Sequence, residues 1–155
     1  NAQILILGSM PGQVSLQAAE YYAHPRNCFW RILAEARSEA IPTSYPYKLD
    51  FLDRHRIALW DVLQFCERKG SLDTNIVAAS EVPNDFHSFI QTLPKLKRIL
   101  FNGKKAEHSF RKYVTDTLVG EQQAIEQIGL PSTSPANASI AYEKKYQSWE
   151  SALNL

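Results

Sequence analysis

The positions of apolar and polar residues divide the chain into short apolar runs that alternate with longer amphipathic segments. Runs at residues 4–7, 57–60 and 98–101 predict buried strands, and a fourth strand is expected to end near residues 129–130. Strands that alternate with helices form parallel sheets covered on both faces. The pattern therefore predicts an α/β protein, a three-layer α/β/α sandwich around a central, mainly parallel sheet of about four strands.

Helices are predicted between these strands and after the last one. In residues 27–37, Phe29, Ile32 and Leu33 follow helical spacing, and Asn27 stands where a helix N-cap is expected. The other predicted helices are residues 48–55, 86–93, 104–113 and 140–153. Turns or irregular connections are expected at residues 41–47, 70–75 and 131–138.

The bulk composition suits one domain spanning residues 1–155, and a chain of this length buries roughly 70% of the surface that its unfolded form exposes. The 17 basic and 16 acidic residues give a net charge of +1, so nucleic-acid binding would have to come from local clusters. Cys28 and Cys66 lack zinc-site spacing, and we expect buried thiols in a reducing compartment, the cytoplasm. No apolar run reaches the ~18 residues of a membrane span.

The first predicted strand ends in a loop bracketed by glycines. The loop consists of Gly8, Ser9, Met10, Pro11 and Gly12. Because glycine has no Cβ, the backbone can turn sharply there and bring its N–H groups against a ligand. The loop lacks the Gly-Lys-Ser/Thr ending of a P-loop and the spacing of a dinucleotide fingerprint, which disfavours both of those sites.

The loop belongs to a longer pattern in residues 4–30, ILILGSMPGQVSLQAAEYYAHPRNCFW. Gly-x-x-Pro-Gly followed by aromatic-Ala-His-Pro-x-Asn-x-Phe-Trp resembles the first motif of the uracil-DNA glycosylase superfamily. The nearest members are its hypoxanthine (deoxyinosine) and mismatch-specific uracil/thymine glycosylases. The resemblance returns in residues 99–107, ILFNGKKAE, and in residues 130–139, LPSTSPANAS.

This resemblance implies a monomeric hydrolase that swings a deaminated base out of DNA and cleaves its N-glycosidic bond. Deoxyinosine is the expected substrate, and uracil and xanthine are the other candidates. Neither motif loop contains a lysine, so no lyase activity is expected. The four histidines show no metal-ligand spacing, and we expect neither a metal nor a cofactor.

A deaminated base presents a carbonyl beside a ring N–H, and a side-chain amide can match that pair with its own donor and acceptor. Asn102 stands where the third strand meets its loop, and the resemblance there suggests that its amide faces the base. The alternative is that Asn102 shapes a turn with Gly103. Asp61 follows the second strand, where related enzymes place a pocket residue. An ionised carboxylate would suit the N–H but repel the carbonyl, and its alternative role is to cap the segment after Trp60.

Aromatic residues supply the candidates for stacking on the base. Tyr22 precedes Ala-His-Pro at the position of the stacking aromatic residue in similar enzymes, a contact worth about 1–3 kcal/mol. Its alternative is an ordinary core tyrosine. Trp60 is either a wall of the binding pocket or a core residue.

Loss of the base requires donors aimed at the departing base anion and a group that guides water to the sugar. The backbone of residues 8–12 and Ser132 are the candidate donors. In related enzymes the residue before Pro-Gly is often a polar group that positions water, but here it is Met10, which cannot do so. Asn27 is the first choice for that role, against the alternative that it only caps the helix. His24 is a second candidate for assisting the leaving base.

The loop at residues 132–137 resembles the second motif of the superfamily, with Ser132 in place of the usual His or Asn. Its hydroxyls and backbone N–H groups suit phosphate contacts. Residues 138–140 are expected to form the wedge that enters the base stack. The predicted DNA-contacting residues are Arg26, Lys104, Ser134, Pro135 and Asn137, and further phosphate candidates, unless they form only a solvated face, are Lys105, Lys144 and Lys145.

Two other classes of function fit the same residues. Met10 and Ser132 suit a catalytically silent reader of altered nucleic acid or a nucleobase-binding protein. The glycine loop also suits a hydrolase of free nucleotides or small esters.

Overall fold

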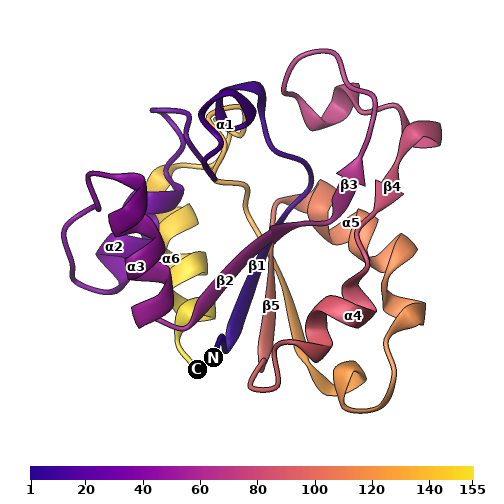
Figure 1. Ribbon diagram of the computed structural model, residues 1–155. Helices are drawn as coiled ribbons and strands as arrows, with labels where there is room; N and C mark the ends of the chain where they lie inside the picture. The colour runs from indigo at the N-terminus through magenta and orange to yellow at the C-terminus, as the bar shows by residue number, and fades with distance from the viewer.

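The computed structural model describes all residues, 1–155, and is built on one central parallel sheet (Figure 1). The strands stand in the order β2-β1-β5-β6, and every neighbouring pair is parallel. Their bounds are β1 Ile4–Gly8, β2 Ile57–Asp61, β5 Arg98–Asn102 and β6 Glu126–Leu130. The predicted parallel sheet is confirmed. Each of the first three strands runs one residue further than expected, so the sheet edge itself carries Gly8, Asp61 and Asn102.

Helices cover both faces of this sheet, which confirms the predicted sandwich. One face carries α2 Phe29–Ala36, α3 Tyr45–Arg54 and α6 Tyr142–Leu153, and the other carries α4 Phe86–Gln91 and α5 Lys104–Tyr113. The alternation of side chains along a strand explains the division. In β1, Ile4 and Ile6 belong to the core under α2 and α6, whereas Leu5 and Leu7 belong to the core under α4 and α5.

The first of these cores is organised around Phe29 and Trp149, both with 0% exposure. Their rings meet edge to face at 6.0 Å, an arrangement that the ring quadrupoles favour. The indole Nε1 of Trp149 donates a 2.9 Å hydrogen bond to the carbonyl of Pro131. The last helix is therefore tied to the loop that follows β6, and this fixes one side of the site described below.

Three elements were not predicted. Helix α1, Gln13–Ala18, buries no side chain, so no apolar stripe marked it. Strands β3, Leu63–Phe65, and β4, Val82–Pro83, pair antiparallel but are too short for a recognisable alternation. Helix α3 also starts inside a segment expected to be a loop. Ser44 caps it by accepting from Tyr47 N, and a proline in the first helical turn is tolerated because its missing N–H would have no partner there.

Short 3₁₀ turns complete the connections, at Asp73–Asn75, Ala78–Ser80, Thr115–Thr117 and Gly120–Ala124. Both cysteines are free thiols that are partly exposed, so the expectation of buried thiols was wrong. Cys28 lies at the start of α2, where its backbone N–H donates to the carbonyl of Thr133 at 3.2 Å. No helix of the chain has the length and apolar character needed to cross a membrane.

Replacing Phe29 by alanine should lower the free energy of unfolding by about 3–5 kcal/mol, because it removes a fully buried ring that contacts Tyr22, Trp30 and Trp149. Denaturant unfolding measures this loss. Val119→Ala is the matched control, since Val119 is 56% exposed and should change stability by less than about 0.5 kcal/mol. Equal effects of the two variants would contradict this account of the core.

Candidate active site

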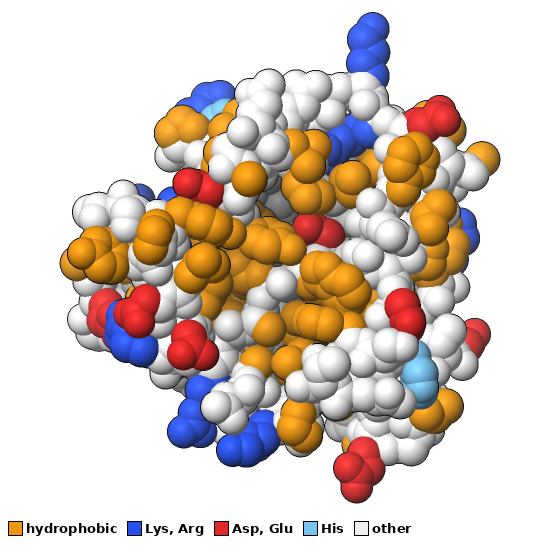
Figure 2. All heavy atoms as spheres, in the orientation of Figure 1, with side chains coloured by type: hydrophobic (Ala, Val, Ile, Leu, Met, Phe, Trp, Pro, Cys, Tyr) orange, Lys and Arg blue, Asp and Glu red, His pale blue; other side chains and the backbone are white.

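The carboxyl ends of β1, β2 and β5 open into one large cleft of about 1550 Å³. Figure 2 shows this face hollowed in its upper half, with apolar side chains around an acidic group. Segments far apart in the chain line the cleft: residues 8–15, 21–27, 71–74, 102–105 and 129–137 contribute to its walls. Both motif loops found in the sequence therefore meet in one place.

The glycine loop is fixed by its neighbours, and its amides are left free. The carbonyls of Gly8 and Ser9 accept from Val62 N at 2.8 Å and from Leu63 N at 3.0 Å. Arg68 Nη2 donates to the carbonyl of Pro11 at 2.5 Å. The backbone N–H groups of Ser9, Met10 and Gly12 donate to no protein acceptor. Fixed, unpaired donors of this kind suit an anionic group in the cleft.

Asp61 lies beside Gly8 at the end of β2, and the two residues are in register. The contact is so close that a Cβ on Gly8 would lie 2.6 Å from Asp61 Oδ1, so a larger residue there would displace this carboxyl group. The carboxyl group is 92% buried, lines the cleft and accepts no hydrogen bond from the protein. Burial raises the pKa of Asp61 to about 7, Arg68 lowers it, and Asp73 raises it further. Near neutral pH this carboxyl is therefore protonated in a large share of molecules.

Asn102 is also buried at the sheet edge, but both ends of its amide are engaged by one residue. Its Oδ1 accepts from Thr133 N at 2.9 Å, and its Nδ2 donates to Thr133 Oγ1 at 2.9 Å. One N–H and one lone pair of this amide remain for a ligand. The next residue, Gly103, has a φ of 99°, and a Cβ there would lie 3.1 Å from that of Ser132. Asn102 and Gly103 together bring the second motif loop against β5.

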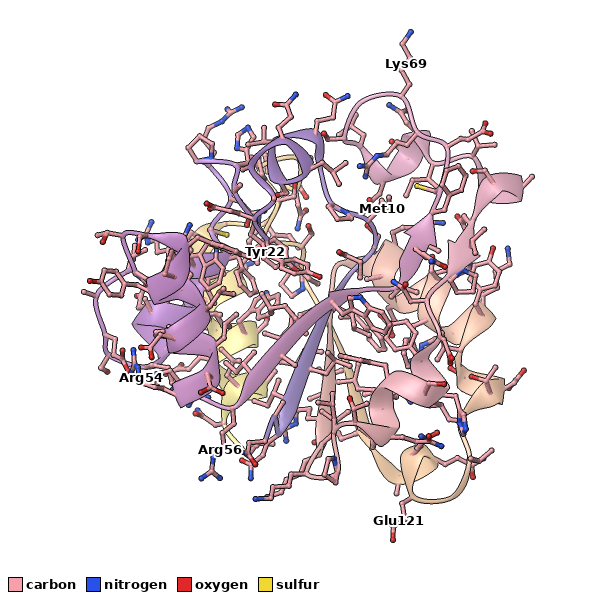
Figure 3. The ribbon with its side chains drawn as sticks, viewed as in Figure 1. Met10, Tyr22, Arg54, Arg56, Lys69 and Glu121 are labelled. Atoms are coloured by element: carbon pink, nitrogen blue, oxygen red, sulfur yellow. The ribbon has the colours of Figure 1, made fainter.

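Tyr22 lies against the wall formed by α2. Its ring stacks on Phe29, with ring centroids 3.9 Å apart, and its hydroxyl points toward Gly8 (Figure 3). Its φ of 53° is uncommon for a residue other than glycine. Burial, and then the nearby Asp61, raise the pKa of Tyr22, so its phenol stays protonated. Tyr22 lines the cleft, with one face of its ring covered by Phe29.

Trp60 does not line the cleft, contrary to one of the two roles expected for it. It precedes Asp61 in β2, and successive side chains of a strand point to opposite faces. Its ring packs on Phe86 and Phe89, with centroids 5.0 and 4.2 Å away. Trp60 is therefore a residue of the core under α4.

Asn27 lines the cleft and lies just before α2. The N-cap of this helix is Cys28, so the predicted N-cap was wrong by one residue. The Oδ1 of Asn27 accepts from Phe29 N at 3.0 Å, and its backbone N–H donates to the carbonyl of His24 at 2.9 Å. The Nδ2 group has no protein acceptor, so two N–H donors and one lone pair of the amide remain for a ligand.

The second motif loop is braced from within. Ser132 Oγ accepts from Ser134 N at 3.2 Å, and Asn137 Nδ2 donates to the carbonyl of Ser132 at 3.2 Å. Thr133, which sequence reasoning did not single out, is 1% exposed and contacts both Asn102 and Cys28. Its place at the centre of the motif was the only signal available.

The basic residues near the cleft divide into two groups. Arg26, Lys104 and Lys144 are exposed on its rim, where they suit contacts with an anionic ligand. Lys145 was considered as a phosphate contact, but it is 6% exposed and its Nζ donates to the carbonyl of Asn137 at 2.7 Å. Lys105 is partly buried and paired with Glu81. The local positive charge available to a ligand is therefore smaller than the lysine count suggests.

The family model of the uracil DNA glycosylase superfamily matches residues 1–154. The chain belongs to this superfamily.

Two curated relatives and one solved structure support this assignment. The chain is 44% identical over 107 residues to a hypoxanthine DNA glycosylase of Methanosarcina barkeri, covering 68% of the chain and 66% of that protein. It is 38% identical over 154 residues to a hypoxanthine DNA glycosylase of Methanosarcina acetivorans, covering 97% and 89%. A solution NMR structure of a candidate uracil DNA glycosylase from Methanosarcina acetivorans matches with a TM-score of 0.81 and 35% identity, covering 99% of this chain and 89% of that one.

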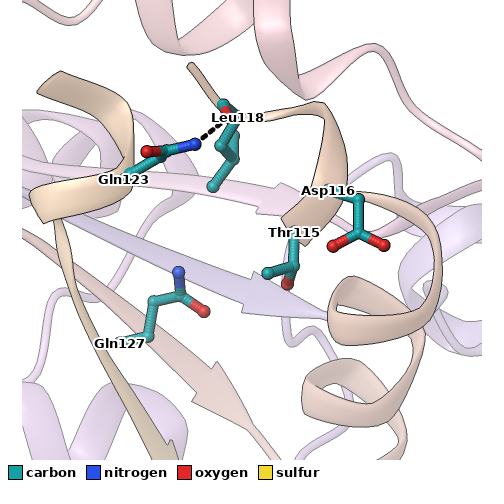
Figure 4. Close-up of a pocket in the computed structure, with 5 residues that line it drawn as sticks. All are labelled: Thr115, Asp116, Leu118, Gln123 and Gln127. Carbon is teal, nitrogen blue, oxygen red and sulfur yellow. Dashed lines mark hydrogen bonds between the residues drawn. The ribbon is translucent and has the colours of Figure 1, made fainter. Parts of the chain in front are cut away.

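In this superfamily member, no group of three or more His, Cys, Asp or Glu side chains is arranged to hold a metal ion. A second hollow of about 390 Å³ lies near the start of β6 (Figure 4). It is lined by Thr115, Asp116, Leu118, Gln123 and Gln127, and Gln123 Nε2 donates to the carbonyl of Leu118 at 2.9 Å. Gln127 pairs with Ile99, near the amino end of the sheet, so this hollow is separate from the cleft.

The raised pKa of Asp61 predicts that Asp61→Asn stabilises the protein more at about pH 8 than at about pH 4.5. The pKa rises from 3.8 to about 7 on folding, so the folded state binds more protons across this window. Stability is therefore lost as pH rises, and an amide, which cannot ionise, avoids that loss. Melting temperatures across the range test this. Asp53→Asn, at an exposed aspartate, is the control, and a constant difference between Asp61→Asn and wild type would contradict the assignment.

Proposed function

We propose that this chain is a monofunctional DNA glycosylase that hydrolyses the N-glycosidic bond of a deaminated base, with deoxyinosine as the preferred substrate. Two relatives that share 38–44% of its residues are named hypoxanthine DNA glycosylases. The observation that carries the proposal is the convergence of both motif loops, Tyr22 and an unpaired buried carboxyl in one cleft. The proposed enzyme acts as a monomer.

The extruded base lies between Tyr22 and the carboxyl group of Asp61 in this proposal. In its protonated form Asp61 donates from one oxygen to the C6 carbonyl of hypoxanthine and accepts the N1–H on the other. Negative charge develops on the base as it leaves, and a neutral acid stabilises that charge, whereas an ionised carboxylate would oppose it. The free N–H groups of the glycine loop supply further donors. Flipping costs least at mispairs, which favours deaminated sites over normal pairs.

Water reaches the sugar on the side of Asn27. Met10 cannot hold it, because a thioether is only a weak acceptor and has no donor. The Nδ2 group of Asn27 donates a hydrogen bond to the water oxygen, and the second lone pair of Oδ1 accepts a hydrogen bond from the water. No strong base is required, since the sugar becomes electron-poor before water attacks. Asn27 thus bonds the first residue of α2 with one lone pair and positions the water with the remaining lone pair and its N–H groups.

DNA is held at the rim by Arg26, Lys104 and Lys144, and the second motif loop contacts the backbone around the flipped nucleotide. Ser132 is already an acceptor for Ser134 N, so its remaining hydroxyl hydrogen is the group that assists the leaving base. Ser134, Pro135 and Asn137 contact the phosphates beside it.

Strand cleavage after alkali treatment of duplexes with a single inosine, uracil or xanthine tests the activity, and inosine should be cleaved fastest. Asn27→Ala should lower the single-turnover rate about 100-fold or more. Asn27→Asp keeps the cap acceptor for Phe29 N but lacks the N–H donors, so it should be equally slow while retaining wild-type stability. Full activity of Asn27→Ala would remove Asn27 from the mechanism, and full activity of Asn27→Asp would show that the acceptor, not the N–H donors, positions the water. Wild-type binding to these duplexes without any cleavage would favour the silent reader, the second candidate that Met10 and Ser132 support.

The base-reading role of Asp61 predicts a pH dependence. Wild-type cleavage of inosine should fall as pH rises through about 7, because the carboxyl group then loses its proton. Asp61→Asn keeps a donor and an acceptor at the same place and should extend the activity to higher pH. Single-turnover rates across the pH range measure the effect. If the cleavage rate of Asp61→Asn falls with rising pH as the wild-type rate does, the loss of activity at high pH belongs to another group.

A further inference from the structure

Extracting a base leaves a gap in the DNA stack, and proteins that unstack bases commonly fill such gaps with an apolar side chain. Residues 138–140 were expected to supply it. The structure leaves this loop with little exposed apolar bulk, since its exposed residues are Ala136, Ala138 and Ser139, and Ile140, which lines the cleft, is only partly exposed. The proposed glycosylase activity therefore requires a filling group from elsewhere on the cleft.

A large apolar side chain stands on the segment of residues 68–74. Leu72 is 49% exposed and lines the cleft. Exposed apolar residues are ordinary on protein surfaces and need no explanation when they are scattered singly. Leu72 belongs to the connection between β2 and α4, residues 62–85, called the insertion below. Other exposed apolar residues of this insertion, Phe65, Val77 and Val82, do not line the cleft. Val14, 39% exposed, also lines the cleft, so Leu72 is distinguished as the larger and more exposed of the two exposed aliphatic side chains there.

This segment is locked to the glycine loop on both sides of Leu72. Ser71 Oγ accepts from Gln13 N at 2.9 Å, and Ser9 Oγ donates to Asp73 Oδ1 at 2.6 Å. Arg68 binds the carbonyl of Pro11, and its side chain is 6% exposed. In Figure 3 the neighbouring Lys69 projects outward above Met10, on the same rim of the molecule. These contacts hold Leu72 in a fixed place relative to the glycine loop.

We propose that Leu72 is the wedge that enters the DNA stack when the target base moves into the cleft. The inference rests on the proposed function and adds a residue that neither motif loop contains. An aliphatic side chain that is half exposed to water lowers its free energy by entering the stack. Residues 68–74 are already held by hydrogen bonds, so the insertion costs little conformational entropy. The hydrogen bonds described above join residues 68–74 to residues 9–13. Insertion of Leu72 into the stack is therefore coupled to the placement of the glycine loop.

The test compares inosine in a duplex with inosine in a single strand, where no stack has to be held open. Leu72→Ala should slow single-turnover cleavage of the duplex about tenfold or more, since unstacking costs a few kcal/mol per step. Cleavage of the single strand should stay within about twofold of wild type. Leu72→Met keeps apolar bulk and should restore most of the duplex rate. Melting temperatures verify that each variant is folded.

Two control variants make the assignment specific. Val77→Ala changes an aliphatic residue of the same insertion that is also 49% exposed but does not line the cleft. This variant should leave both cleavage rates unchanged. Ile140→Ala tests the loop first expected to hold the wedge. A duplex-specific loss in Ile140→Ala with a normal rate in Leu72→Ala would overturn the proposal. Equal losses of Leu72→Ala on both substrates would overturn it too, because the residue would then act in the pocket.

Fluorescence of 2-aminopurine next to the inosine reports unstacking without requiring cleavage, so it separates this proposal from the activity itself. Wild-type protein should raise the signal on binding, and Leu72→Ala should raise it less. If wild type cleaves neither substrate, the proposed activity fails while the fluorescence still decides the role of Leu72. An unchanged signal in Leu72→Ala at saturating protein would reject the wedge.

Discussion

The site depends on the pair of hydrogen bonds between Asn102 and Thr133. They join the end of β5 to the second motif loop, and the carbonyl of Thr133 then accepts from Cys28 at the start of α2. Three segments distant in sequence are thus held together at one edge of the sheet. The side chains of Asn102 and Thr133 are buried, and an unsatisfied polar group there would cost about 1–3 kcal/mol. The loops therefore occupy one arrangement, which a site that holds a base and a water molecule requires.

Charge is distributed to match the two parts of a nucleic-acid ligand. The floor of the cleft carries Asp61, whose burial favours the neutral form, and the unpaired amides of the glycine loop. Positive side chains remain on the rim. A net charge of +1 is consistent with this arrangement, because phosphate contacts need only a few exposed cations at the right edge. In the proposed function, the interior would recognise a neutral base and its departing anion, and the rim would recognise the backbone.

The insertion between β2 and α4 gives the cleft its second wall. It is anchored twice, by Arg68 on the glycine loop and by Glu81 on Lys105 and Tyr113 of α5. Little of it lies in regular structure, yet both anchors involve charged groups that are largely buried. Charge-assisted hydrogen bonds are roughly twice as strong as neutral ones, so these anchors restrain an irregular segment. That rigidity is why a leucine on this wall can serve as a wedge.

The sequence by itself determined the sheet, its helices and the family, because apolar periodicity and the Gly-Ser-Met-Pro-Gly and Ser-Thr-Ser-Pro strings are local properties. It also placed the start of α2 within one residue, with Asn27 expected as N-cap where the structure has Cys28. Only the tertiary structure decided which side chains reach the cleft. Pleating at the end of β2 sends Trp60 into the core and Asp61 into the cleft, and one residue of register would reverse them. Three other features join residues from different segments: the hydrogen bonds between Asn102 and Thr133, the burial of Lys145, and the contacts on either side of Leu72. Such pairings leave no periodic pattern in the sequence.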